Sequence, residues 1–127
     1  MNDLCNRLFD FSINTLQFLK QVKYSDINKV LIYQLAKSAT SCGANYEEAQ
    51  AASSKADFIN KINILLKEIR EANYWLRLIE GLDISSTDKI DSLIQESNEL
   101  KKNTWKNFIY IQKKSITIFN FTFYLSP

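Results

Sequence analysis

The chain has 127 residues, of which 46% are apolar and 24% are charged. This length and composition suit one domain with a hydrophobic core and exclude a disordered or fibrous chain. Two glycines and one proline are too few for the turns of a β-sandwich or α/β fold, so helices with short loops are favoured, while a net charge of +2 permits an anionic partner without requiring one.

Two apolar stripes follow the first predicted helix, which covers about residues 3–23. The first consists of Leu4, Leu8, Phe11 and Phe18, and the second, beside it, of Cys5, Phe9, Ile13 and Leu16. A helix with so wide an apolar face needs cover on more than one side.

Small residues fill the second half of the next predicted helix, which covers about residues 27–52 with Ser25 or Asp26 as its N-cap. Gly43 lies among them, and glycine inside a helix costs roughly 1 kcal/mol relative to alanine. We interpret Gly43 as a point where another helix approaches closely; a hinge or an opening for a ligand is the alternative.

An apolar seam marks the third predicted helix, which begins after Ser54 and Asp57 in a capping-box pattern and has Gly81 as its C′ residue. The seam keeps a 4-3-4-3 spacing, typical of near-parallel helix packing at about 20°. It consists of Phe58, Ile62, Leu65, Ile69, Ala72, Leu76 and Ile79.

The fourth predicted helix covers about residues 86–114, after an N-cap at Ser85. Ser97 and Thr104 dilute its apolar line, so we expect a partner or a second subunit to complete its burial. The apolar line consists of Ile90, Leu93, Leu100, Phe108 and Ile111.

The last residues, 116–127, change from helical to strand spacing. Phe119, Phe121, Phe123 and Leu125 alternate there with other side chains. We therefore predict an all-α, antiparallel, up-down-up-down four-helix bundle over residues 1–115, with a short extended C-terminal tail that packs on its own bundle, packs on a neighbouring subunit or is mobile.

The sequence contains no histidine, which excludes Ser-His-Asp and Cys-His catalysis, the usual zinc hydrolases, haem ligation by histidine and the ferritin-like di-iron motif. No glycine-rich phosphate loop is present. We predict a protein that is not an enzyme and has no catalytic residue, metal or cofactor. A carboxylate-only metal site from Glu47, Glu48, Glu68 and Glu71 is the alternative.

Two isolated cysteines, Cys5 and Cys42, lie outside any CxxC motif. The N-terminus does not resemble a signal peptide, and charges or amides interrupt every apolar run before it could span a membrane. We expect a reducing cytoplasm with both thiols acting as small hydrophobes; a surface disulfide is the alternative.

Polar side chains follow the small residues of the second helix and flank the seam of the third. A buried polar group without a partner costs about 1–3 kcal/mol, so we interpret them as a network that fixes the helix register, with a ligand-binding notch as the alternative. The candidate residues are Ser41, Asn45, Glu48, Glu68 and Glu71.

Lysines cluster on the fourth helix with Trp105 and Tyr110 between them. Such a cluster is a candidate surface for the phosphates of a nucleic acid, although scattered lysines usually mark a solvated face. The candidate residues are Lys101, Lys102, Lys106, Lys113 and Lys114.

Two stretches resemble a known family. Residues 38–69 read SATSCGANYEEAQAASSKADFINKINILLKEI, and residues 71–79 read EANYWLRLI. Their S-x-x-S-x-G-x-N-x-x-E-A, D-F-I-x-K and E-x-x-Y-W-L patterns resemble the 23S rRNA-intervening-sequence protein family, also called four helix bundle proteins.

This resemblance implies an antiparallel bundle that assembles as a homopentamer. Relatives include the accessory protein of diversity-generating retroelements, whose basic barrel binds nucleic acid and a reverse transcriptase. Further copies of the chain, RNA or DNA, and a reverse transcriptase are therefore the expected partners. We predict a non-enzymatic homo-oligomer associated with nucleic acid, and the alternative is a protein-interaction scaffold that binds none.

Overall fold

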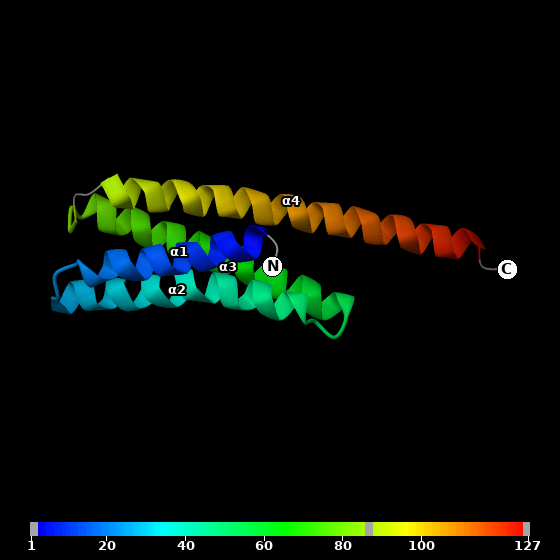
Figure 1. Ribbon diagram of the computed structural model, residues 1–127, viewed down its shortest axis with the longest axis horizontal. Coiled ribbons are helices and arrows are strands. Elements are labelled where there is room, and N and C mark those ends of the chain that lie inside the picture. The colour runs from blue at the N-terminus through cyan, green and yellow to red at the C-terminus, as the bar shows by residue number, and fades with distance from the viewer. Residues whose placement is uncertain (1–2, 86–87, 126–127) are drawn as a thin grey trace.

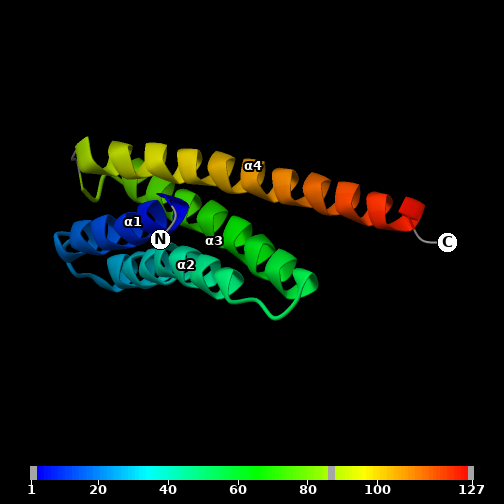
Figure 2. The same ribbon diagram turned by 45° about the vertical axis from the view of Figure 1, so that its right-hand side comes forward.

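Four helices make up the computed structural model, which describes the backbone of residues 3–85 and 88–125 and the side chains as far as residue 113. The helices are α1 (Asp3–Lys20), α2 (Asp26–Gln50), α3 (Lys55–Gly81) and α4 (Asp88–Leu125). Each contacts the next along the chain, and α1 also contacts α4, so the four close into one bundle (Figures 1 and 2). The predicted all-α up-down-up-down bundle is confirmed.

Serine side chains begin α2 and α3 at the predicted positions. Ser25 Oγ accepts a hydrogen bond of 3.0 Å from the Asn28 N–H, and Ser54 Oγ accepts one of the same length from the Asp57 N–H. In return, Asp57 Oδ2 accepts the Ser53 N–H at 3.3 Å, one residue earlier than in a standard capping box. Both caps occupy N–H groups that have no partner inside the helix.

The end of α3 differs from the prediction. Gly81 is the last helical residue rather than C′, and the left-handed conformation falls on Asp83, with a φ of 53°. Aspartate tolerates this region better than most side chains because its short polar group can bond locally. Residues 86–87, where the fourth helix was predicted to begin, lie outside the described residues.

The helix α4 continues to Leu125, so the extended conformation predicted from residue 116 onward is wrong as far as that residue (Figure 1). Residues 126–127 lie outside the described part. Lengthening an existing helix adds one backbone hydrogen bond per residue, whereas a lone strand has no neighbour to pair with. Strand spacing in a sequence therefore predicts a strand only where a second strand is available.

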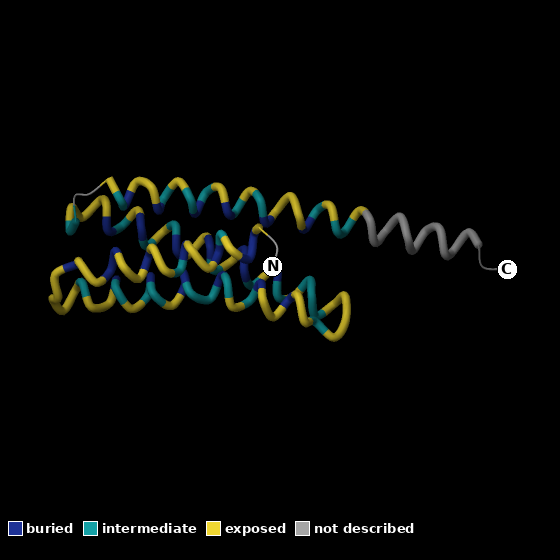
Figure 3. The backbone as a smooth tube through the Cα atoms, in the orientation of Figure 1, coloured by how far each residue is buried: buried dark blue, intermediate teal, exposed yellow. Residues whose placement is uncertain are grey.

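The core runs along the centre of the bundle (Figure 3). The predicted seam of α3 is buried from Ile62 to Ile79, and Phe58 is partly buried at its start. The apolar line of α4 is buried even where polar residues interrupt it, since Ser97 and Thr104 are each 1% exposed. The burial expected from a partner is thus supplied to these residues by the other helices of the same chain.

The second apolar stripe of α1 is largely left exposed by the bundle. Cys5 is buried, but Phe9 is 58% exposed, and Ile13 and Leu16 are exposed too. Within the described residues, α1 contacts α2 and α4, and its first stripe is the one that these contacts bury. The predicted need of α1 for cover on more than one side is therefore not met within one chain.

Small residues bring α1 and α2 close together. A Cβ atom built on Gly43 would lie 3.6 Å from Leu8 Cβ and 3.7 Å from the Leu8 carbonyl oxygen. One helical turn away, Ser12 Oγ lies 3.2 Å from both the Ala39 and Leu8 carbonyl oxygens, to which it donates. Gly43 therefore lies where α1 packs on α2, but a methyl group there would make only an ordinary contact with Leu8, so the packing does not require glycine.

Both cysteines are buried thiols. Burial raises the pKa of the Cys42 thiol far above its ordinary value, with the Glu68 carboxylate adding to the effect, and burial likewise raises the pKa of Cys5. Because the thiolate is the reactive form, neither side chain is an activated nucleophile. Within the described residues, no helix combines the length and apolar character that crossing a membrane requires.

Candidate functional site

The predicted lysine cluster divides over two sides of α4. Lys101 and Lys102 turn toward α3, where they line a hollow of about 230 Å³ between the two helices. Lys106 turns toward α1 instead and lines a different pocket. The helical repeat accounts for part of the division, because Lys101 and Lys106 are five positions apart and point about 140° away from each other around the helix, whereas Lys102 and Lys106, four positions apart, remain neighbours on its surface.

The hollow between α3 and α4, here called the α3/α4 groove, combines cations with an aromatic ring. It is lined by Leu66, Arg70, Lys101, Lys102 and Trp105. Trp105 is 50% exposed, and its ring lies 5.8 Å from that of buried Phe108, with an interplanar angle of 34°. The indole therefore packs on the core on one side and is open to solvent on another.

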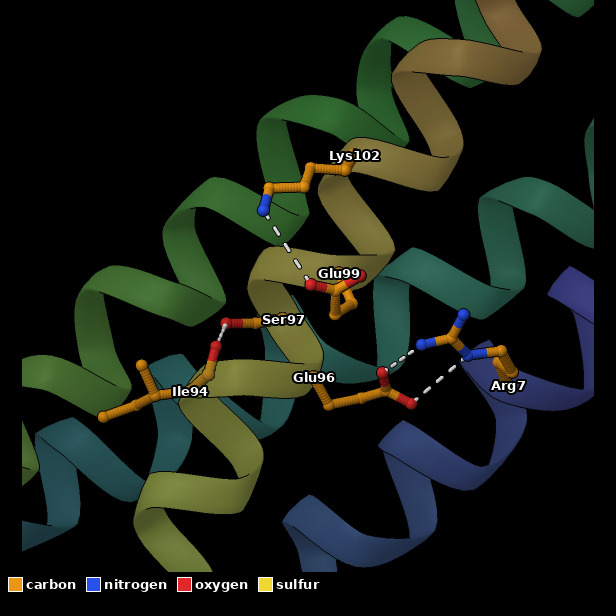
Figure 4. Close-up of polar contacts among 6 residues, drawn as sticks. All are labelled: Arg7, Ile94, Glu96, Ser97, Glu99 and Lys102. Carbon is orange, nitrogen blue, oxygen red and sulfur yellow. Dashed lines mark hydrogen bonds and ion pairs between the residues drawn. The ribbon is translucent and has the colours of Figure 1, made fainter.

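Few carboxylates offset the positive charge of the groove. Lys102 Nζ lies 3.8 Å from Glu99 Oε1, but both side chains are largely exposed, and such pairs are weak (Figure 4). Among the residues that the structure describes, neither Arg70 nor Lys101 forms an ion pair. The groove consequently attracts anions.

A hydrogen-bonded network joins α3 to α4 beside the groove. Asn73 Nδ2 donates to Ser97 Oγ at 2.8 Å and to Asn98 Oδ1 at 3.3 Å. Arg77 Nε donates to Asn73 Oδ1 at 2.8 Å. Ser97 Oγ donates to the Ile94 carbonyl at 2.7 Å, as Figure 4 shows. These bonds fix how the two groove walls are aligned along their axes.

Sequence reasoning missed Asn73 and did not place Arg70 in the candidate surface. The signal for both was their spacing from Leu66, because residues four and seven positions later share its side of a helix. That spacing shows which residues share a side, but it does not show which neighbouring helix lies there.

Lys106 belongs to a pocket of about 410 Å³ that has mixed charge. Its lining consists of Asp3, Leu4, Arg7, Tyr46, Asn103, Lys106 and Asn107. Arg7 forms an ion pair with Glu96, with Nη2 on Oε1 and Nε 3.4 Å from Oε2 (Figure 4). Because Arg7 is neutralised and Asp3 adds an anion, this pocket attracts a phosphate less than the α3/α4 groove does.

The last two predicted lysines lie farther along α4. Lys113 is exposed, and the side chain of Lys114 lies outside the described residues. The groove therefore includes Lys101 and Lys102 from the predicted set and adds Arg70.

The predicted polar residues on α2 form mainly local bonds. Ser41 Oγ donates to the Lys37 carbonyl at 2.7 Å, and Asn45 Nδ2 donates to the Ser41 carbonyl at 2.8 Å. Glu48 reaches α3, where its Oε2 lies 2.7 Å from Lys61 Nζ and raises the pKa of that lysine.

The remaining two polar residues lie one turn apart on α3. Burial raises the pKa of the Glu68 carboxyl and the charge of Glu71 raises it further, while Lys37 and Lys67 oppose the shift. A single network that fixes register, or a notch for a ligand, remains a prediction for the five residues. Across the described residues, no three histidine, cysteine or carboxylate side chains gather as metal ligands, and the carboxylate-only alternative gains no support.

Comparison with known proteins settles the family. The family model described as 23S rRNA-intervening sequence protein matches residues 2–106. The chain belongs to this family. As a 23S rRNA-intervening sequence protein it has its entire α3/α4 groove inside the matched region, whereas Lys113 and Lys114 lie beyond it.

A solved structure supports the same assignment. It is described as a protein with unknown function from the S23 ribosomal protein family of Bacteroides thetaiotaomicron VPI-5482. Its sequence is 32% identical, the TM-score is 0.74, and the match covers 83% of this chain and 97% of that chain. No curated protein matches the chain. The resemblance found in residues 38–79 is thus confirmed.

Proposed function

We propose that this protein is a homo-oligomeric module that associates with nucleic acid and acts by binding. The observation that carries the proposal is the α3/α4 groove, where Arg70, Lys101 and Lys102 surround an exposed indole. Lysine and arginine side chains that replace counterions along a phosphate backbone give affinity without regard to sequence. The groove has the charge and shape for such contacts.

Nucleic-acid binding measured against salt concentration tests this proposal. We expect RNA and DNA to bind at low salt and the logarithm of the affinity to fall linearly with the logarithm of salt. Replacing Arg70, Lys101 and Lys102 together by alanine should weaken binding and reduce the slope by about one for each phosphate that the protein no longer neutralises.

A matched variant replaces Lys23, Lys29 and Lys55, which are exposed and lie outside the groove, by alanine. It removes the same charge and should keep most of the affinity. Absence of binding at low salt, a salt-independent affinity, or equal losses of affinity in the two triple variants would each refute the assignment of the groove.

Self-association is assigned to the apolar side of α1. The exposed residues Phe9, Ile13 and Leu16 share one side of the helix at spacings of four and three. Next to them, a hollow of about 350 Å³ between α1 and α2 is lined by Leu16, Leu19, Lys20, Ile32 and Ala36. An exposed apolar patch of this kind marks an interaction surface, and we call it the α1/α2 face.

The number of copies, five, and a reverse transcriptase as partner remain predictions from the resemblance.

Sedimentation of the Ile13→Glu variant tests the role of the α1/α2 face. We expect wild type to be oligomeric and the Ile13→Glu variant to be monomeric, with its helical circular dichroism retained. Leu82→Glu places the same charge on an exposed apolar residue beyond α3 and should leave the oligomer intact. A monomeric wild type, or an intact Ile13→Glu oligomer, would contradict the assignment.

The alternative function, a protein-interaction scaffold without nucleic acid, is favoured by the same apolar surface. The two functions differ in whether the α3/α4 groove binds nucleic acid. A stable oligomer that binds neither RNA nor DNA at low salt would favour the scaffold.

A further inference from the structure

We infer that the α3/α4 groove accepts single-stranded rather than duplex nucleic acid, with a base stacked on Trp105 and the adjoining phosphates on Arg70, Lys101 and Lys102. This inference rests on the proposed function and specifies the form of nucleic acid that the groove takes.

The environment of Trp105 favours stacking of an unpaired base. Its indole is half-exposed in the middle of a cationic surface, although contact with phosphates alone requires no aromatic ring. Phe108, which is buried, supports the indole from the core side at a centroid distance of 5.8 Å. A flat, supported and partly solvated ring is the kind of platform on which unpaired bases stack.

The arrangement of the cations favours one nucleic-acid backbone over the two of a duplex. Arg70 lies on the α3 wall, and Lys101 and Lys102 lie on the α4 wall, so the charges flank one narrow groove. Lys106 lines a different pocket, together with residues of α1. A duplex presents two backbones and keeps its base faces stacked inside, whereas a single strand offers one backbone and free base faces.

A second aromatic residue follows along α3. Tyr74 is four residues after Arg70 and is half-exposed, and the Arg77 guanidinium carbon lies 5.8 Å from its ring centre. Eight residues separate Leu66, beside Trp105, from Tyr74, which is about 12 Å of helix. A strand stacked on Trp105 can thus continue toward Tyr74.

The experiment compares three probes of equal length with the full chain: oligouridylate, oligothymidylate and an RNA duplex. We expect both single strands to bind more tightly than the duplex. Trp105→Ala should weaken single-strand binding about tenfold, the loss typical of one stacked base, and should leave duplex binding unchanged. Trp105→Phe keeps an aromatic ring and should retain most of the affinity, while Tyr24→Ala removes an exposed aromatic ring far from the groove and should have no effect.

Fluorescence provides an independent readout. The protein has two tryptophans, so a Trp75→Phe variant emits from Trp105 alone. Stacking on a base should quench this emission when oligouridylate binds, and the duplex should not quench it.

Equal affinity for single strand and duplex would overturn the inference, as would an unchanged affinity of Trp105→Ala for oligouridylate. Salt-dependent binding in either case would leave the proposed function standing. If none of the three probes binds at low salt, the inference and the proposed function both fail.

Discussion

The α1/α2 pair and the α3/α4 pair lie on opposite sides of the bundle and join their helices by different means. Between α1 and α2, small residues let the backbones approach, and Ser12 bonds directly to the Ala39 carbonyl. Between α3 and α4, Asn73 bridges to Ser97 and Asn98 through side chains. One pair is held by close approach and the other by a hydrogen-bonded network.

The outer surfaces of the two pairs differ accordingly. The α1/α2 face is apolar and is proposed to bind another copy of the chain, whereas the α3/α4 groove is cationic and is proposed to bind nucleic acid. Because the two lie on different helices, an oligomer formed through the first can keep the second open. Substitutions in each pair test whether α1 and α2 depend on close approach and whether α3 and α4 depend on the hydrogen-bonded network.

The largest effect is expected from Ala39→Leu. Ala39 is fully buried where α1 meets α2, so the larger side chain should overfill the contact and lower the free energy of unfolding by about 1–3 kcal/mol. Urea unfolding measures the change. Gly43→Ala is the matched control, because its new methyl group meets Leu8 at an ordinary contact distance of 3.6 Å and gains up to about 1 kcal/mol of helix propensity. Unchanged stability of Ala39→Leu would show that the helices do not approach closely.

A smaller loss is expected from Asn73→Ala on the other side. The substitution removes the amide that joins α3 to Ser97 and Asn98, and it should cost about 1–2 kcal/mol in urea unfolding. The loss is limited because Ser97 keeps its bond to the Ile94 carbonyl. Asn63→Ala changes an exposed amide on the same helix and should stay within about 0.5 kcal/mol. Equal effects of the two variants would mean that the network does not hold the pair together.

The smallest effect concerns pH at the end of the α3/α4 pair. A hydrogen bond with Asp91 raises the pKa of the exposed Glu80 carboxyl in the folded protein. The folded state therefore binds this proton more tightly than the unfolded state, and the resulting stabilisation is lost as pH rises through the folded pKa. Glu80→Gln should be slightly more stable than wild type at neutral pH, and this advantage should disappear in acid. Thermal unfolding at several pH values measures this difference in stability. An advantage of Glu80→Gln that persists in acid would contradict the hydrogen bond between the Glu80 and Asp91 carboxyl groups.

Much of the fold follows from short-range rules in the sequence. The seam from Ile62 to Ile79 is regular enough to give α3 its buried side, and Ser25 and Ser54 begin their helices as predicted because capping depends on only three following residues. The end of α3 was less predictable, since Asp83 rather than Gly81 adopts the left-handed conformation.

The surfaces were less predictable than the core. Lys101, Lys102 and Lys106 form one cluster in the sequence, yet α3 and α1 flank α4 on different sides and separate Lys106 from the other two. Arg70 is distant from them in sequence and completes their groove. No local pattern contains this information, because it depends on which helices are neighbours.

The sequence by itself determined that the chain forms four helices, where α2 and α3 begin and which residues of α3 face the core, because these depend on spacing along a single helix. Only the tertiary structure decided that the second stripe of α1 stays exposed and that α4 continues as a helix to Leu125. It also decided that Arg70 and Trp105 share one groove. The physical reason is the same in each case: a side chain's exposure, and the groove it joins, depend on the helices packed beside it.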